Sequence, residues 1–108
     1  MEQVEFLEQH IFTGLKNLND EFKQDKIQYF SESDFEIVLQ RAEHFGISIY
    51  EIESRLNGEG YGISTHEEHK KKATDPRWFK KAFLTSKNRQ PGLSYSAKYK
   101  VSKKLLTR

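Results

Sequence analysis

The first hydrophobic pattern of the chain has the period of a helix. Between residues 4 and 22, apolar side chains recur at spacings of three or four, which aligns them along one stripe. We expect this helix to run from about residue 2 to residue 24, with a weak point at Gly14, because a glycine inside a helix costs about 1 kcal/mol relative to alanine. Phe6 and Phe12 lie off the stripe and are spare apolar residues in this interpretation. The stripe itself consists of Val4, Leu7, Ile11, Leu15, Leu18 and Phe22.

A second helix is marked at both ends by capping residues. Ser31 can cap its N-terminus, while Ser33 with Glu36 forms a competing capping box, so the start of the helix stays open by two residues. Gly46 fits the left-handed position that ends a helix. The buried stripe of this helix consists of Phe35, Val38, Leu39 and Ala42.

After Gly46 the apolar period changes from near four to two, which predicts strands. Residues 47–56 form the first predicted strand, and Asn57 with Gly58 forms the two-residue turn of a hairpin. The pairs that follow from this turn are Leu56 with Glu59, Ser54 with Tyr61, Ile52 with Ile63, and Tyr50 with Thr65. Ile63 then lies on the buried face of the sheet.

A third helix is predicted after the polar stretch at residues 66–74. Asp75 fits the capping position and Pro76 the first helical position, where its missing N–H costs no hydrogen bond. We expect this helix to end near Lys87. Its apolar stripe consists of Phe79, Ala82 and Phe83, with Trp78 alongside.

The last segment has the clearest strand pattern. From residue 93 to residue 101, apolar and polar side chains alternate without exception, so Tyr95 and Tyr99 point inward. The order helix, helix, strand, strand, helix, strand predicts one α+β domain over residues 1–108, in which a small antiparallel sheet of about three strands is packed on one face by helices. A right-handed crossover through the third helix places the last strand beside the first.

Composition limits the classes of function. The 108 residues give room for one domain, and a hydrophobic share of 35% with a charged share of 31% predicts a small core under a densely charged surface. The chain has no cysteine, which excludes disulfides, thiolate catalysis and cysteine-ligated metal sites. Its N-terminal stretch is acidic, and no window approaches a membrane span, so we expect a cytoplasmic protein with no membrane partner.

Charge is distributed unevenly along the chain. Residues 1–69 carry 5 basic and 15 acidic side chains, whereas residues 70–108 carry 13 basic and 1 acidic. One interpretation is binding of nucleic acid or another polyanion, because lysines neutralise phosphates. The candidate residues for this binding are Lys70, Lys71, Lys72, Lys103, Lys104 and Arg108.

The other interpretation of the charge pattern is internal neutralisation. If the last strand lies beside the first, Lys98 and Lys100 come close to Glu51 and Glu53 on the outer face of the sheet. Such cross-strand pairs contribute a few tenths of a kcal/mol each. In this arrangement the tyrosines and the lysines of the last strand lie on opposite faces, so that strand offers no surface on which bases could stack.

Residues 41–52 also resemble a helix-turn-helix core, with Ala42 and Gly46 four residues apart. A recognition helix after Gly46 would present Glu51 and Glu53 to phosphates, which would repel them. The β-branched and aromatic residues of this segment favour a strand instead.

One cluster, His66-Glu67-Glu68-His69, has the residue types of a metal site. Its histidines are three residues apart, which still allows both imidazoles on one face of a helix. Glu67, Glu68 or His10 could complete the site, so a metal-dependent enzyme at His66 and His69 is one alternative and a solvated turn is the other. The sequence contains neither a nucleophile elbow nor a phosphate-binding loop, and we therefore predict no catalytic residue elsewhere.

Four segments resemble parts of small bacterial proteins that carry no assigned activity. From the first of these segments to the last, the likeness spans about two-thirds of the chain. It implies an α+β fold and supplies no catalytic residues. The segments run from Phe30 to Phe35, Ile47 to Glu53, Asp75 to Phe79 and Leu93 to Ala97.

The leading functional hypothesis is a non-enzymatic protein-binding or regulatory module of a bacterial cell, without a cofactor. A protein partner or a second copy of the chain is expected, because the first helix leaves Phe6 and Phe12 available for contact. Trp78 belongs either to the core or to an interface, and it is included with these two among the candidate partner-binding residues. Polyanion binding and a metal-dependent enzyme are the alternatives.

Overall fold

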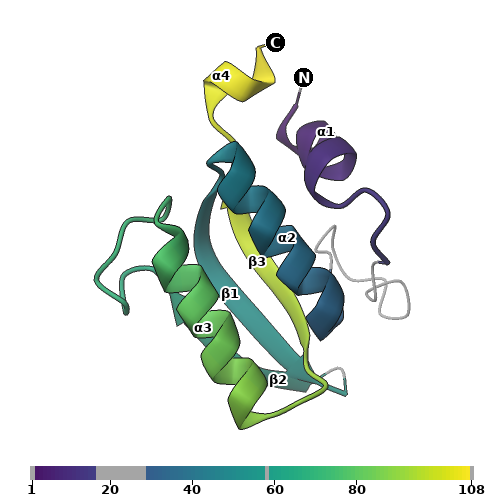
Figure 1. Cartoon of the computed structure of the whole chain (residues 1–108), viewed down its shortest axis with the longest axis vertical. Helices are drawn as coiled ribbons and strands as arrows, with labels where there is room; N and C mark the ends of the chain where they lie inside the picture. Colours follow the sequence, from purple (N-terminus) through teal and green to yellow (C-terminus); the bar gives the residue numbers. More distant parts are fainter. Residues whose placement is uncertain (1, 17–28, 58, 108) are drawn as a thin grey trace.

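The computed structural model describes residues 2–16, 29–57 and 59–107 (Figure 1). The elements in chain order are α1 (Gln3–Phe6), the π-helical turn η1 (Leu7–Ile11), α2 (Glu32–Phe45), β1 (Ser48–Leu56), β2 (Glu59–Thr65), α3 (Pro76–Arg89), β3 (Ser94–Lys100) and α4 (Lys103–Leu106). The strands form an antiparallel sheet in the order β2-β1-β3. The α+β class, the order of the elements and the position of β3 beside β1 are therefore confirmed.

Helices α2 and α3 cover the same face of the sheet, and the core lies between these two layers (Figure 1). Aromatic rings fill much of it, since each ring buries a large area. The ring of Tyr95 from β3 stacks on Phe35 of α2, with 5.2 Å between the ring centroids. The same ring meets Phe83 of α3 edge-on at 5.0 Å. One inward tyrosine thus ties both helices to the sheet.

The capping residues of α2 and α3 have the predicted roles. The hydroxyl of Ser31 accepts a hydrogen bond from the backbone N–H of Asp34 at 3.3 Å, so the competing start at Ser33 is not used. Gly46 ends α2 with a φ of 68°, the left-handed region that favours glycine. The carboxylate of Asp75 accepts from the N–H of Arg77 at the start of α3. Local hydrogen bonds therefore set these boundaries.

The prediction of a long first helix is wrong. Helical structure begins at Gln3 and ends at Ile11, and Gly14 beyond it has a φ of 80°. Val4 is 52% exposed, whereas Phe6 is buried. A π-helical turn has more residues per turn than an α-helix, so the inward stripe passes through Phe6 rather than Val4. Leu18 and Phe22, which the prediction also assigned to this helix, lie outside the described residues.

The predicted register of the hairpin is confirmed for the pair next to the turn and is wrong for the pairs beyond it. Leu56 pairs with Glu59 as predicted, but a bulge follows, and Ile63 pairs with Glu53 instead of Ile52. Glycines at positions 60 and 62 flank the extra residue, Tyr61, and glycine in a strand favours such a bulge. The shift turns Ile63 to the outer face, where it is mostly exposed.

Candidate functional site

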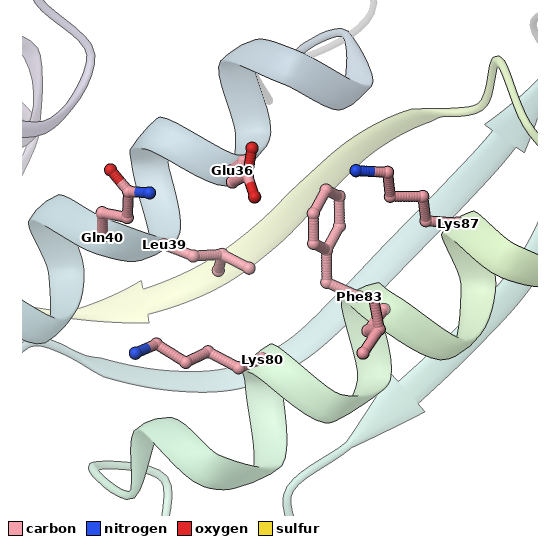
Figure 2. A pocket seen from close by; sticks show the side chains of 7 residues that line it. Glu36, Leu39, Gln40, Lys80, Phe83 and Lys87 are labelled. Carbon is pink, nitrogen blue, oxygen red and sulfur yellow. The ribbon is translucent and has the colours of Figure 1, made fainter.

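A groove separates α2 from α3 on the surface of the helical layer (Figure 2). We call it the α2–α3 groove. Its volume is about 290 Å³. Figure 2 shows Leu39 from α2 and Phe83 from α3 facing the space between the helices. The residues that line the groove are Glu36, Leu39, Gln40, Lys80, Phe83, Leu84 and Lys87.

The groove follows from the spacing of residues on two antiparallel helices. Lining residues recur at intervals of three and four on each helix, so they share one face beside the buried stripe. Lys80 near the start of α3 pairs with Glu43 near the end of α2, at 2.5 Å. Lys87 near the end of α3 pairs with Glu32 at the start of α2, at 3.9 Å. The two ion pairs join the helices on either side of the groove.

The middle of the groove is apolar and partly open. Leu39 and Phe83 are buried at its base, and Leu84 remains 55% exposed at its margin. Glu36 forms no ion pair with any residue that the structure describes. The groove therefore offers an apolar surface and one carboxylate that is available to a ligand.

Leu84 and Glu36 were not among the predicted binding residues, and Glu36 was considered only as part of a capping box with Ser33. The sequence does hold a clue to Leu84, which directly follows the stripe residues Ala82 and Phe83. Three consecutive apolar residues make the apolar face of this helix wider than its contact with the sheet, so one of them remains exposed. No comparable signal marks Glu36, because its position depends on how α2 and α3 lie against each other.

The internal neutralisation predicted from the charge pattern is present in part. Lys98 pairs with Glu51 across the sheet at 3.5 Å, as predicted. The second predicted pair is wrong: a bulge in β1 places Lys100 opposite Ser48, and Glu53 accepts a hydrogen bond from the hydroxyl of Tyr29 at 2.5 Å. With the two pairs beside the groove, three ion pairs between described residues join the acidic part of the chain to its basic part.

The tyrosines of β3 point inward, which confirms the prediction for this strand. Tyr95 is fully buried, and Tyr99 packs edge-on against Phe12 with 5.5 Å between ring centroids. Burial raises the pKa of Tyr95 to about 12, with a smaller contribution from the nearby Glu32 carboxylate. Burial also raises the pKa of Tyr99. Neither ring is available to stack on a base.

The three predicted partner-binding residues lie against their own chain. Phe6 is buried, and Phe12 packs on Phe30 with 5.1 Å between ring centroids. Trp78 is 1% exposed. The premise that Phe6 and Phe12 are spare apolar residues is therefore wrong, because Phe6 is part of the core and Phe12 is partly buried against it.

The two predicted metal-binding histidines pack on Trp78. The ring centroid of Trp78 lies 6.4 Å from that of His66 and 5.6 Å from that of His69. The Nδ1 of His66 is within hydrogen-bond distance of the carbonyl of Lys71, at 2.8 Å. His10, a possible third ligand, lies beside Phe6. Within residues 2–16, 29–57 and 59–107, no three histidine or carboxylate side chains form a group that could hold a metal.

The predicted polyanion-binding lysines lie on two exposed segments. Lys70, Lys71 and Lys72 are in the turn before α3, and Lys103 and Lys104 are in α4. Both segments approach the start of β1. The backbone N–H of Ile49 donates to the carbonyl of Ala73, and Lys100, shortly before α4, is opposite Ser48. Arg108 lies outside the described residues.

No known protein family, curated protein or solved structure matches this chain. In the described part of the chain, every helix is too short or too polar to cross a bilayer. The geometry of the α2–α3 groove and of the lysine-rich surface therefore carries the functional argument.

Proposed function

We propose that this chain is a non-enzymatic protein-binding or regulatory module of the bacterial cytoplasm and that the α2–α3 groove is its binding surface. The observation that supports this proposal is the combination, in one concave surface, of a buried apolar base, the exposed Leu84 and a carboxylate, that of Glu36, which forms no ion pair with a described residue. Short protein segments bind such grooves by inserting apolar anchors along one face of a helix.

The partner is a segment with one large apolar side chain and a basic residue nearby. The volume of about 290 Å³ is at the lower end of the range for ligand pockets, which suits a side chain better than a cofactor. Lys80 and Lys87 already have carboxylate partners in α2, so Glu36 is the charged lining residue that a ligand can address. An arginine in the partner satisfies it.

A selection of displayed helical peptides, followed by NMR mapping of their contact surface, tests the proposal. We expect the selected peptides to carry a leucine or aromatic anchor with a nearby arginine, and to shift the resonances of Glu36, Gln40 and Leu84. The Leu84→Asp variant should weaken binding at least about tenfold, because a charged group then faces the apolar anchor.

The matched control is Val4→Asp, since Val4 is 52% exposed and Leu84 is 55% exposed. Both variants should remain folded, and the control should keep full affinity. The proposal fails if the selected peptides bind Leu84→Asp as tightly as they bind the control.

A further inference from the structure

An exposed aromatic ring lies at the start of β1, next to the lysine-rich turn. Tyr50 is 38% exposed. It is the extra residue of a bulge in β1, because Ile49 pairs with Tyr99 and Glu51 pairs with Lys98, which leaves Tyr50 without a partner in β3. Because of the bulge, the ring of Tyr50 is partly exposed, whereas Tyr95 of β3 is buried in the core.

Hydrogen bonds hold this ring against the turn that carries Lys70, Lys71 and Lys72. The N–H of His66 donates to the carbonyl of Tyr50 at 3.2 Å, and the two rings meet edge-on with 5.7 Å between centroids. Two contacts fix the turn to His66: the N–H of Lys71 donates to its carbonyl at 3.1 Å, and the carbonyl of Lys71 lies 2.8 Å from its Nδ1. We call this arrangement, residues 66–73 with Tyr50, the basic turn.

The cations of the basic turn form no ion pair within the described chain, and the Asp75 carboxylate, which interacts electrostatically with Lys71, is paired with Arg77. Lys70, Lys71 and Lys72 are exposed, and none of them forms an ion pair with a described residue. Lys100 adds a further exposed lysine on the other edge of β1, opposite Ser48.

Carboxylates near the basic turn are partly engaged elsewhere. Glu51 pairs with Lys98, and Glu68 accepts hydrogen bonds from the N–H and the hydroxyl of Thr65. Glu67 is exposed in the same turn and has no ion-pair partner among the described residues. The unpaired lysines therefore outnumber the free carboxylates.

We infer that the basic turn binds single-stranded nucleic acid, with a base stacked on Tyr50 and phosphates contacted by Lys70, Lys71 and Lys72. Proteins that bind single strands combine lysines along the backbone with aromatic rings for the bases. Bases in a duplex are already stacked on each other, so one partly exposed ring of a strand, next to a lysine-rich turn, suits an unpaired strand of nucleic acid. This surface is distinct from the α2–α3 groove, and neither proposal depends on the other.

Fluorescence anisotropy with a short labelled oligodeoxythymidylate tests the inference. The full chain should bind at low ionic strength, and replacing all three lysines by glutamine should flatten the dependence of log Kd on log salt concentration by about 2, since each contact with a single strand contributes about 0.7. Tyr50→Ala should weaken binding about five- to a hundredfold, and Tyr50→Phe should retain it, because stacking needs the ring and not the hydroxyl.

Tyr61→Ala is the matched control, because Tyr61 is 40% exposed but lies in the bulge of β2. It should bind as the parent chain does, and far-UV circular dichroism should show that all variants are folded. Heparin is a polyanion without bases, so its binding separates simple attraction of anions by the lysines from stacking of a base on Tyr50. The inference is overturned if Tyr50→Ala binds as tightly as Tyr61→Ala, if heparin binding loses as much affinity as oligonucleotide binding in Tyr50→Ala, or if no binding occurs at low salt.

Discussion

Lysines line the α2–α3 groove and also make up part of the basic turn, but only those of the groove are paired with carboxylates. In the groove, Lys80 and Lys87 reach across to glutamates of α2 and hold the two helices together. In the basic turn, three consecutive lysines form no ion pair with a described carboxylate. The comparison teaches that a basic segment is available to a ligand only where the fold leaves its charges unpaired.

The largest expected effect comes from the ring beneath the basic turn. Trp78→Ala should lower the free energy of unfolding by about 3–5 kcal/mol, because it removes a fully buried aromatic side chain. The rings of His66 and His69 pack on this tryptophan, so oligonucleotide binding should fall more than peptide binding in the groove. Urea unfolding followed by circular dichroism measures the stability. A loss below about 1 kcal/mol would contradict the assignment of Trp78 to the core.

The next effect is the loss of stability at alkaline pH, which probes the inward tyrosines. Burial raises the pKa of Tyr95 from 10.0 in the unfolded chain to about 12 in the fold. The folded state therefore prefers the neutral phenol, and its stability is full below pH 10 and declines as pH rises from 10 to 12. Unfolding at fixed urea concentration, measured across this range, should show a smaller decline for Tyr95→Phe. Identical curves for both proteins would refute the linkage.

A smaller change should separate the groove from the basic turn. Ser31→Ala removes the N-cap of α2 and should cost about 1 kcal/mol of stability, because the N–H of Asp34 loses its acceptor. Peptide binding in the groove should weaken, since Glu36 lies little more than one helical turn beyond this cap, and binding to the basic turn should not change. Ser33→Ala is the control, because the hydroxyl of Ser33 lies 3.4 Å from that of Ser31 but is not the acceptor for the N–H of Asp34. Equal losses in the two variants would argue against Ser31 as the cap.

The smallest effect concerns the paired lysines themselves. A double-mutant cycle on Lys80 and Glu43 should give a coupling energy of about 0.2–1 kcal/mol that decreases with salt, as for other exposed ion pairs. The single variant Lys71→Gln should change the free energy of unfolding by no more than about 0.5 kcal/mol, since this lysine is exposed and forms no ion pair with a described residue. Thermal unfolding at two salt concentrations measures both. A stability change in Lys71→Gln that exceeds the coupling energy of Lys80 and Glu43 would show that Lys71, and not Lys80, contributes to the folded state.

The features that could be predicted from the sequence are those set by neighbouring residues. Ser31 and Gly46 bound α2, and the strict alternation from residue 93 to residue 101 defines β3. The early end of the first helix and the bulge at Tyr61 were not predicted. Both depend on which apolar side chains the neighbouring helices and strands can bury. The groove was missed for a similar reason, since Glu36 and Leu84 meet only through the packing of α2 on α3.

The two bulges explain why the candidate site was only partly predictable. The lysines of the basic turn follow from composition alone, and they were predicted. Tyr50 was assigned to a regular pair with Thr65, whereas the structure pairs Glu51 with Thr65. Its exposure depends on two registers: that of the hairpin, which the bulge at Tyr61 shifts, and that of β1 with β3, which lies far from β1 in the sequence.

The bulge in β2 also bears on how the sheet ends. Strand β2 is an outer strand of the sheet, and a row of unpaired backbone groups at such an edge can recruit another chain and start aggregation. The extra residue at Tyr61 interrupts the regular row, and the carboxylate of Glu68 already occupies the N–H of Thr65 at 3.2 Å. Only a short regular stretch of this edge remains for an incoming strand, which makes the β2 edge a poorer template for pairing with another chain.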